Sequence, residues 1–394
     1  MNKEKITYYI KALRFFLYPL YFISFLVPKK NTIWVFGAHQ NRFSENSKSL
    51  FLYVSNNNTN IQAVWISGDK KLSHSLQKKG LNSFYKWSIK GLYLSLRAKY
   101  YFYNVYSDDI NFYTSGNTTL VNLWHGIPLK KIEFDDKDGA LSRQFNSKYS
   151  FIYSFFKPYN FIRPNYVLST SKIVSQKLAS AFRITEDKCL EFGYPRNDIF
   201  YEENTLIQKN LISSFNIDDE KIIFYLPTWR NNNINIISSA FPNLDELNTT
   251  LQASNIKLFI KLHPNDTTVN YQHSNILYLN SQQDLNELLL VSDYLITDYS
   301  SVYFDYLHLN KEIIFYPFDY DTYVDKERKF YFEYELATPG IKVKNFQELV
   351  KTLSNLETLN YEKTRQKLKN ELWTYQDNNA SKRIMQHFEK RLIQ

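Results

Sequence analysis

The sequence contains a single cysteine, Cys189, among its 394 residues. One thiol cannot form a disulfide within the chain, and it excludes a zinc site built from several cysteines. This scarcity is typical of a protein in a reducing compartment. Glycine is also scarce, at 9 residues, whereas tyrosine and phenylalanine are abundant, at 32 and 30. No low-complexity tract occurs and 44% of the residues are hydrophobic, so the chain can bury a packed core throughout.

The sequence also lacks a hydrophobic run long enough to cross a membrane. Tyr8 to Val27 is apolar and aromatic, but its uncharged core, Phe15 to Val27, has only 13 residues and contains Pro19. A membrane-spanning helix needs about 20 residues. Basic residues flank the segment, so we expect residues 1–30 to form an interfacial helix on the anionic cytoplasmic face of a membrane. The alternative is a helix that packs on its own domain. A signal peptide is less favoured, because no small-residue cleavage site follows the segment.

Basic residues outnumber acidic ones, 48 to 39, which gives a formal net charge of +9. This charge favours an anionic partner such as a nucleotide, a phosphopolymer or an acidic membrane surface. The basic residues are dispersed and form no nucleic-acid-binding module, so we expect no nucleic-acid partner. The length suffices for two domains of ordinary size, and it leaves the oligomeric state undetermined.

Short apolar runs alternate with helical patterns in two successive series. The expected strands are residues 32–36, 63–66, 100–103, 120–123 and 166–169 in the first series, and 221–225, 257–261, 276–278, 294–297 and 312–316 in the second. This alternation predicts an α/β fold with two Rossmann-like domains that face a cleft. We place the domains at residues 31–205 and 206–375. A C-terminal helix in residues 376–394 could pack back on the first domain.

The stretch DYLITDYSSVYFDYLHLN, residues 293–310, reads as a buried strand, a tight turn through Asp298 and a helix that begins at Ser300 and Ser301. In parallel α/β domains such a helix start presents free N–H groups and a positive dipole end to anions. Two interpretations stay open at this point. The two hydroxyls and the carboxylate could face a phosphate, or they could only cap a helix.

A second polar stretch, LWHGIPLKK, also follows an expected strand. His125 comes at the strand end, and Gly126 lets another group approach the backbone. Lys130 and Lys131 add charge suited to phosphate. A lone histidine is more often structural than catalytic, but this one stands between a tryptophan and a glycine and precedes basic residues. It is therefore a candidate site residue.

The second series contributes further candidates at its strand ends and in a later loop. Thr228 and Arg230, in LPTWR, could hold phosphate through hydroxyl and guanidinium groups. His263, in KLHP, is a second histidine that could contact a phosphoryl group. In RKFYFEYELATPG, Arg328 can pair with a diphosphate, and Glu333 can accept hydrogen bonds from ribose hydroxyls or a base edge.

Together and in this order, WHGIPLKK, GYPRND, LPTWR, KLHP, SDYLITDYSSVYFDY, YPFDYDTY and RKFYFEYELATPG resemble the CDP-glycerol glycerophosphotransferase family, the enzymes of teichoic acid and related capsule synthesis. The similarity runs from about Asn31 to the C-terminus. The resemblance implies a GT-B fold, a CDP-glycerol or CDP-ribitol donor, and transfer of polyol phosphate to a hydroxyl of a lipid-linked or polymeric acceptor with release of CMP. It also implies a peripheral location at the cytoplasmic face of the cell membrane.

The resemblance further implies roles for individual residues. His125 becomes the candidate base, on an acceptor side that also includes Gly126, Lys130 and Lys131. The residues that would surround the donor diphosphate are His263, Thr228, Arg230, Ser300, Ser301 and Arg328. Asp298 would orient the site and Glu333 would bind the cytidine ribose. We count His125, His263 and Asp298 as the predicted catalytic residues.

One departure from the family pattern matters. The family commonly has Arg-Gly-Phe-Tyr where this chain has residues 328–331, RKFY, and an aspartate where Glu333 stands. The geometry of the donor loop, and with it the choice of glycerol or ribitol, is therefore open. No cofactor is required by the sequence. We find no DxD-like pair that demands a metal and expect the acidic run 135–138 to be a solvated loop, so Mg²⁺ is unsupported.

Two other functions compete with this prediction. A GT-B glycosyltransferase that uses a sugar nucleotide shares the fold and the charge pattern, so the fold cannot separate the two. A non-catalytic, membrane-bound scaffold of a polymer assembly complex is the second alternative. It would not need two histidines, two serines and several arginines together at strand ends.

Overall fold

The computed structural model describes most of the chain. The described residues are 14–57, 60–137, 144–145, 148–230, 235–262, 273–280, 283–326 and 329–392. Two predicted site residues, His263 and Arg328, lie outside them, and so does the first part of the expected N-terminal helix, residues 1–13.

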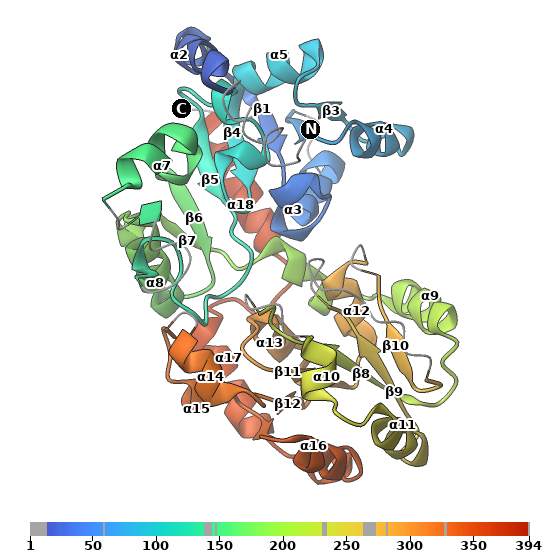
Figure 1. The fold of residues 1–394 in the computed structure, drawn as a ribbon. Coiled ribbons are helices and arrows are strands. Elements are labelled where there is room, and N and C mark those ends of the chain that lie inside the picture. The colour runs from blue at the N-terminus through green and yellow to red at the C-terminus, as the bar shows by residue number, and fades with distance from the viewer. Residues whose placement is uncertain are drawn as a thin grey trace, which may run out of the picture. The chain divides into compact units, whose positions relative to one another are not determined.

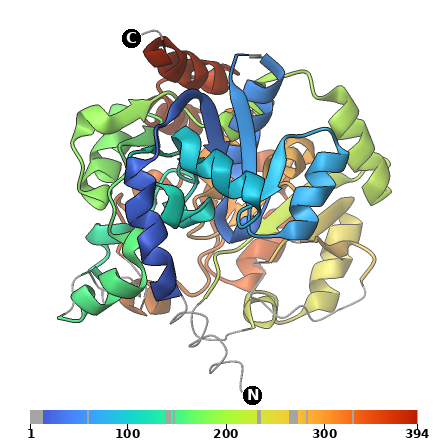
Figure 2. The same cartoon turned by 90° about the horizontal axis from the view of Figure 1, so that it is seen from above.

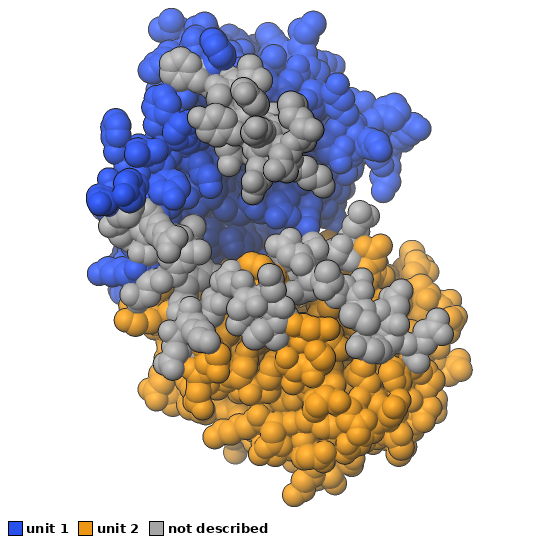
Figure 3. All heavy atoms as spheres, in the orientation of Figure 1, with its two compact units in different colours: residues 1–125, 132–198, 377–394 blue, residues 126–131, 199–376 orange. Residues whose placement is uncertain are grey.

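The chain divides into two compact units (Figure 3). Unit 1 comprises Met1–His125, Ile132–Asp198 and Asp377–Gln394, and unit 2 comprises Gly126–Lys131 and Ile199–Gln376. The chain leaves unit 1 after Asp198, a few residues before the domain boundary that we expected at residue 205. The short segment 126–131, which we expected in the first domain, belongs to unit 2.

Unit 1 is built on a sheet of seven parallel strands (Figure 1). The strands are β1 (Lys30–Phe36), β2 (Gln62–Ser67), β3 (Ser83–Tyr85), β4 (Ala98–Tyr103), β5 (Thr119–Asn122), β6 (Tyr166–Ser169) and β7 (Cys189–Glu191). Their order is β3-β2-β1-β4-β5-β6-β7, so β4 is central. Consecutive residues of β1 and β4 are buried, as expected of strands covered on both faces. The helices that pack on this sheet are α3 (Glu45–Asn57), α4 (Lys70–Lys78), α5 (Ile89–Arg97) and α8 (Lys172–Phe182).

Unit 2 is built on a second parallel sheet, of six strands. They are β8 (Lys221–Leu226), β9 (Ile256–Ile260), β10 (Ile276–Tyr278), β11 (Tyr294–Thr297), β12 (Ile313–Phe315) and β13 (Ile341–Lys342), in the order β10-β9-β8-β11-β12-β13. Its helices are α9 (Thr205–Phe215), α10 (Ile236–Ala240), α11 (Leu244–Ala253), α12 (Leu285–Val291), α13 (Val302–Tyr306), α14 (Tyr320–Lys326), α15 (Tyr334–Ala337), α16 (Phe346–Leu353) and α17 (Glu362–Leu372).

The two sheets confirm the predicted α/β class, and each expected strand is present within a residue or two. Three edge strands, β3, β7 and β13, were not predicted. They have only two or three residues, too few to show an apolar run that stands out from its surroundings.

The helix expected to begin at Ser300 and Ser301 is short. Helix α13 has five residues and continues into a 3-10 turn, Leu307–Leu309. Ser301 stands at the N-cap position without a capping hydrogen bond, whereas Ser300 Oγ accepts a 3.4 Å bond from the N–H of Val302. A single helical turn aligns few peptide dipoles, so the expected dipole contribution at this point is weak.

Helix α18 (Ala380–Glu389) carries the C-terminal segment onto the sheet of unit 1. Figure 2 shows this helix, in dark red, next to strand β1, and the ring of Phe388 meets that of Trp34 with centroids 6.3 Å apart. Asp198 accepts hydrogen bonds from the first two N–H groups of the helix, at 2.9 and 3.0 Å. The carboxylate therefore caps the helix from a distant part of the chain.

The described part of the N-terminal segment forms a 3-10 turn (Arg14–Leu17) and helix α2 (Tyr18–Leu26). One face of α2 packs on unit 1, where Tyr21 stacks on Phe112 at 4.4 Å and Ser24 Oγ accepts a bond from the N–H of Gly116. Its other face is exposed, with Leu26 at 82%. Among the described residues, no helix has both the length and the apolar character to cross a bilayer.

Candidate functional site

The loop that follows β5 is held by two buried asparagines. Asn122 Oδ1 accepts a 2.8 Å hydrogen bond from the N–H of Trp124. Asn46, on α3 and fully buried, donates from Nδ2 to the carbonyls of Leu123 and Trp124, both at 3.0 Å. These bonds hold Trp124 at a φ of +53°, which few residues other than glycine adopt. The next residue, His125, is thereby positioned at the carboxyl edge of the sheet.

His125 has an exposed surface, yet enough protein surrounds its ring to desolvate it. Its Nδ1 lies 3.5 Å from the carbonyl oxygen of Asn104. Because a carbonyl can only accept, this long contact favours the tautomer with the hydrogen on Nδ1 and a free lone pair on Nε2. Desolvation lowers the pKa of His125; the charge of Glu45 opposes this shift and that of Arg196 adds to it. The ring is therefore uncharged at neutral pH and can accept a proton.

Three residues that support this loop were not predicted from the sequence. Arg196, in GYPRND, forms an ion pair with Glu45, and its N–H donates to Asn46 Oδ1 at 3.2 Å. Glu45 adopts a φ of +64° at the start of α3. These contacts tie the GYPRND turn to the loop that carries His125. The sequence offered no signal for Glu45 and Asn46, because the helix that carries them lies far upstream.

We expect Asn46→Ala to lower the free energy of unfolding of unit 1 by about 3 kcal/mol. The change leaves two buried carbonyls and one N–H without their partner, and each such group typically costs about 1–3 kcal/mol. The loop that carries His125 would also lose its support, so turnover should fall together with stability. Urea unfolding monitored by tryptophan fluorescence measures the first effect, and a transfer assay measures the second.

Asn57→Ala is the matched control for this variant. Asn57 ends the same helix, is exposed and donates to the carbonyl of Tyr53 at 2.9 Å. We expect this substitution to leave both stability and turnover nearly unchanged. Equal unfolding midpoints for the two variants would contradict the positioning role of Asn46.

The residues that follow His125 pair with a later segment inside unit 2. The N–H of Lys131 donates to the carbonyl of Lys329 at 2.7 Å, and Lys130 and Phe330 form an antiparallel bridge. Lys130 Nζ donates to the hydroxyl of Tyr323 at 2.9 Å. The segment 126–131 therefore packs against the residues that come directly after predicted donor residue 328.

This pairing corrects the expected location of Gly126, Lys130 and Lys131. We had placed them in the first domain, whereas the structure assigns them to unit 2, and their acceptor-side role stays a prediction. Gly126 adopts a φ of +136°, a conformation that suits glycine, and the chain passes between the units there. No local sequence pattern predicts such a pairing, because its two partners lie far apart along the chain.

In unit 2, a buried ion-pair network joins three loops at the carboxyl edge of the sheet. Arg230, after β8, is 6% exposed, and it donates to Asp298 Oδ2 at 2.8 Å and to Asp319 at 2.8 and 3.0 Å. Asp298 also accepts from the N–H groups of Thr228, at 2.8 Å, and Tyr299, at 2.5 Å. Because β8, β11 and β12 are neighbours, the network fixes their following loops against one another.

This arrangement gives Arg230 a structural role, and its contact with the donor stays a prediction. The sequence predicted a direct contact with the donor diphosphate, but two carboxylates occupy the guanidinium fork in this structure. Arg230 therefore holds the loops in place. Asp298 is fully buried at the centre of the network, and its predicted catalytic role stays a prediction.

Tyrosine rings surround this network and were not among the predicted residues. Tyr299 stacks on Tyr323 with centroids 3.8 Å apart, and the guanidinium of Arg230 lies 5.1 and 4.7 Å from the two rings. The hydroxyl of Tyr299 donates to Asp319 at 3.1 Å, and that of Tyr334 donates to the carbonyl of Asp298 at 3.1 Å. Rings that exclude water strengthen the enclosed ion pairs.

The other predicted donor residues differ in their surroundings. The hydroxyl of Thr228 is buried and has no hydrogen-bond partner within the described part of the chain, so it keeps its bonding capacity for a ligand. Ser300 and Ser301 are half-buried beside Asp298 in the chain. Glu333 is exposed at the start of α15 and makes no capping bond through its side chain.

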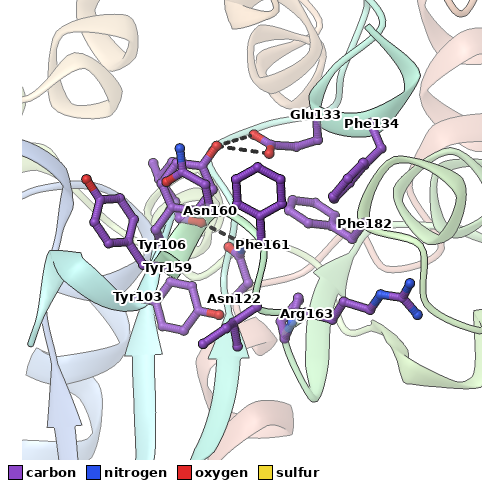
Figure 4. Close-up of a pocket in the computed structure, with 13 residues that line it drawn as sticks. Tyr103, Tyr106, Asn122, Glu133, Phe134, Tyr159, Asn160, Phe161, Arg163 and Phe182 are labelled. Atoms are coloured by element: carbon purple, nitrogen blue, oxygen red, sulfur yellow. Dashed lines mark hydrogen bonds between the residues drawn. The ribbon is translucent and has the colours of Figure 1, made fainter. Parts of the chain in front are cut away.

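A small cavity lies at the carboxyl ends of β4 and β5 in unit 1 (Figure 4). Its volume is about 10 Å³, room for a single water molecule. Figure 4 shows the hydroxyl of Tyr106 donating to the carboxylate of the buried Glu133, whose oxygens lie 3.0 and 2.9 Å away. Phe134, Phe161 and Phe182 line the same space. A nucleotide does not fit there, so this cavity is not the donor site.

The acidic run at residues 135–138 differs from the solvated loop that we expected. Asp136 is 2% exposed, and Asp135 accepts a 2.9 Å bond from Ser180 Oγ. Asp135 and Asp136 therefore pack into unit 1, whereas Lys137 is exposed. Across the described ranges, no group of three or more histidine, cysteine or acidic residues is arranged to hold a metal ion.

Known proteins resemble this chain over almost its whole length. The family model described as CDP-Glycerol:Poly(glycerophosphate) glycerophosphotransferase matches residues 19–390. The teichoic acid glycerol-phosphate transferase of Staphylococcus aureus (strain NCTC 8325 / PS 47) is 31% identical over 386 residues, which cover 95% of this chain and 97% of that protein. A teichoic acid poly(glycerol phosphate) polymerase of Bacillus subtilis (strain 168) is 28% identical, over 87% of this chain and 46% of the polymerase.

A solved structure, that of the wall teichoic acid polymerase TagF, has a similar fold. The TM-score is 0.80 at 23% sequence identity, and the match covers 98% of each chain. This likeness shows the fold, whereas the family match and the S. aureus relative show the family. The chain belongs to the CDP-glycerol:poly(glycerophosphate) glycerophosphotransferase family.

Proposed function

We propose that this protein transfers a polyol phosphate, most readily glycerol phosphate, from a CDP-polyol to a hydroxyl of a lipid-linked or polymeric acceptor and releases CMP, in teichoic acid or capsule synthesis. Membership of the family and the relatives named for glycerol-phosphate transfer support this function. The observation that carries the chemistry is His125, an uncharged imidazole at the sheet edge of unit 1 whose Nδ1 contact with a carbonyl favours an unprotonated Nε2.

In the proposed reaction the acceptor oxygen forms a bond to the β-phosphorus of the donor while the bond from that phosphorus to the CMP oxygen breaks. His125 Nε2 takes the proton of the acceptor hydroxyl. Such a transfer depends on positioning and charge neutralisation more than on covalent catalysis. CMP leaves as a phosphate, which is stable as an anion and needs no proton from the protein.

The loops of unit 2 would supply the donor contacts. Asp298 positions Thr228 through its N–H, and the hydroxyl of Thr228 has no hydrogen-bond partner among the described residues. This hydroxyl and that of Ser300, two residues after Asp298, can donate hydrogen bonds to diphosphate oxygens. His263 and Arg328 are predicted to add charge there. The GT-B arrangement, in which the two units face each other across a cleft, stays a prediction.

A substrate comparison tests the function. The purified full chain is incubated with a lipid-linked acceptor and, in turn, radiolabelled CDP-glycerol, CDP-ribitol and a UDP-sugar, and both CMP release and label on the acceptor are measured. We expect transfer from CDP-glycerol. Transfer from the UDP-sugar alone would favour a glycosyltransferase, and no CMP release with any acceptor would favour the non-catalytic scaffold.

We also propose that unit 1 associates with the cytoplasmic face of the cell membrane through two adjoining helices, α2 and α7 (Ser150–Phe156). Tyr18 of α2 stacks on Phe155 of α7 at 5.9 Å, and its hydroxyl donates to the carbonyl of Phe155 at 2.5 Å. The exposed apolar side chains of this surface are Phe16, Phe22, Ile23, Phe25, Leu26, Phe151, Ile152, Phe155 and Phe156. Lys30 follows α2 in the chain and Lys148 precedes α7. Both lysines are exposed, and their positive charges can bind anionic lipids.

We expect the double variant Phe22→Glu, Phe151→Glu to bind anionic vesicles at least about tenfold more weakly. The two rings are 66% and 80% exposed, so their loss removes apolar contact with lipid and adds negative charge without disturbing the core. Co-sedimentation with phosphatidylglycerol vesicles measures the effect. Leu206→Glu, on the 73% exposed Leu206 of α9, is the control. Equal sedimentation of the two proteins would reject this membrane surface.

A further inference from the structure

A second histidine, His39, lies at the carboxyl edge of the sheet of unit 1. It belongs to the 3-10 turn His39–Asn41, which begins three residues after the end of β1. His39 Nδ1 lies 3.3 Å from Asp109 Oδ1, and the imidazole is 56% exposed whereas the carboxylate is 4% exposed. Asp109 Oδ2 accepts bonds from the N–H groups of Asn104 and Val105, at 3.2 and 2.8 Å. The backbone therefore fixes the aspartate. The aspartate in turn orients the imidazole through Nδ1, so Nε2 takes no part in this contact.

One residue connects this pair with His125. The N–H of Asn104 donates to Asp109, and its carbonyl oxygen is the group 3.5 Å from His125 Nδ1. Its side-chain oxygen accepts from the N–H and the hydroxyl of Ser47, at 3.2 and 2.9 Å. Strand β4, which ends at this point, lies between β1 and β5. The two histidines thus flank the end of a single central strand.

The two histidines differ in how readily they take up a proton. The hydrogen bond to Asp109 raises the pKa of His39, aided by the charges of Asp109 and Asp108 and opposed by burial and by Arg42. The pKa of His125 is lowered instead, chiefly by desolvation. When the environment shifts the pKa values of two neighbouring groups in opposite directions, one group is suited to be the base and the other to carry a proton. His125 is therefore suited to act as the base. His39, which is bonded to a buried carboxylate, is the histidine that is more readily protonated.

The chemistry of the proposed reaction offers a protonated His39 a role on the acceptor. The departing CMP needs no proton, so an acid has no substrate atom to protonate. The product of one transfer, however, carries a phosphodiester one polyol unit away from its new hydroxyl. An enzyme that uses such a product as its acceptor must place that anion near its base. An imidazolium and an exposed arginine next to it can bind a phosphodiester oxygen by charge-assisted hydrogen bonds.

We propose that His39, held by Asp109, and the exposed Arg42 form a subsite for the terminal phosphodiester of a polyol-phosphate acceptor. This inference rests on the proposed function, and it names residues that would bind an acceptor chain that already ends in a polyol phosphate. His39 binds the phosphate next to the terminal unit, and the hydroxyl of that unit is presented to His125. The sequence did not single out His39, because nothing beside it in the chain indicates the distant Asp109.

The test compares His39→Ala and His39→Arg with the wild-type full chain. Two lipid-linked acceptors are used that share the same anchor, one ending in glycerol phosphate and one ending in a sugar hydroxyl. For His39→Ala we expect the KM of the phosphate-terminated acceptor to rise at least about tenfold, with kcat within about threefold. The KM values of CDP-glycerol and of the phosphate-free acceptor should stay unchanged. His39→Arg should restore the acceptor KM, because the positive charge is restored.

Three results would overturn the proposal. An unchanged KM in His39→Ala removes His39 from the subsite. An equal rise with both acceptors assigns the contact to the anchor that the two acceptors share. A large loss of kcat that arginine does not rescue assigns an acid–base role. His74→Ala, an exposed histidine on α4 of the same unit, is the control and should behave as wild type.

A binding measurement separates this proposal from the proposed function. Calorimetry with a soluble glycerol phosphate oligomer needs no turnover. Binding that weakens at least about tenfold in His39→Ala and recovers in His39→Arg supports the subsite even for a chain that releases no CMP. Equal affinity of the wild type and His39→Ala for the oligomer overturns it.

Discussion

Replacement of His125 by alanine is expected to lower kcat for transfer from CDP-glycerol by about 10²- to 10⁴-fold, the usual contribution of a general base. The substitution removes an uncharged imidazole whose Nε2 is free, while the loop around it keeps its bonds to Asn46 and Asn122. The dissociation constant of CDP-glycerol should therefore stay close to that of the wild type. Steady-state transfer rates and equilibrium binding of the donor measure the two quantities.

The pKa shift of His125 also predicts how activity depends on pH. Because the pKa of His125 lies below its ordinary value of 6.5, the base stays unprotonated as the pH falls to 6.5, and activity should be lost only at lower pH. Arg196→Ala removes a charge that lowers this pKa, so the acid limb should move to higher pH. Glu45→Gln removes a charge that raises it, so the limb should move to lower pH.

His74→Ala on α4 provides the comparison for the alanine substitution. Near-wild-type turnover of His125→Ala would eliminate the histidine as the base. An acid limb that stays in place in both charge variants would assign that limb to another group. Loss of donor binding together with turnover would mean that the substitution disturbs more than proton transfer.

Asp298→Ala is expected to have the largest effect on stability. Asp298 is fully buried, and its loss leaves Arg230 short of a carboxylate and two N–H groups without an acceptor. Breaking a buried ion pair from one side typically costs about 3–5 kcal/mol. We expect a loss of that size in unit 2, and loss of CDP-glycerol binding because the loops after β8, β11 and β12 separate. Urea unfolding and calorimetric titration with the donor measure both.

The surface pair of Asp245 and His273 supplies a control in the same unit. Asp245 is 97% exposed, so Asp245→Ala should leave stability and donor binding nearly unchanged. A double-mutant cycle of Arg230→Ala and Asp298→Ala should be strongly non-additive, since each single change already disrupts the network. Additive losses, or donor binding that survives Asp298→Ala, would contradict the role we assign to the network.

Strands were readily predicted where their residues form apolar runs. Strand β8, KIIFYL, is buried from its second residue onward, so its pattern is visible without any partner. The edge strand β13 has only two residues, and it is a strand because it pairs in parallel with β12. The stretch 293–310 was predicted with the correct strand and turn, and its helix begins at Val302, directly after the expected start at Ser300 and Ser301. The turn after β11 is determined by Asp298 bonding to two other N–H groups, which capping preferences do not reveal.

Arg230 and Lys130 show where the prediction of site residues stopped. An arginine after a strand suggests phosphate binding, but two carboxylates from other loops take up its donors here. A lysine after WHG suggests the first domain, but its segment pairs with residue 330 in unit 2. In both cases the deciding partner lies about 70 or more residues away along the chain.

The sequence by itself determined the α/β class, the strands of both sheets and the motifs that identify the family, because apolar periodicity and strand-end motifs are local properties. Only the tertiary structure decided that segment 126–131 belongs to unit 2, that Arg230 holds loops, and that Asn46, Glu45 and Arg196 support His125. It also brought Asp109 to His39. Hydrogen bonds and ion pairs between distant residues form when the sheets assemble, so their partners are set by strand order and not by neighbours in the chain.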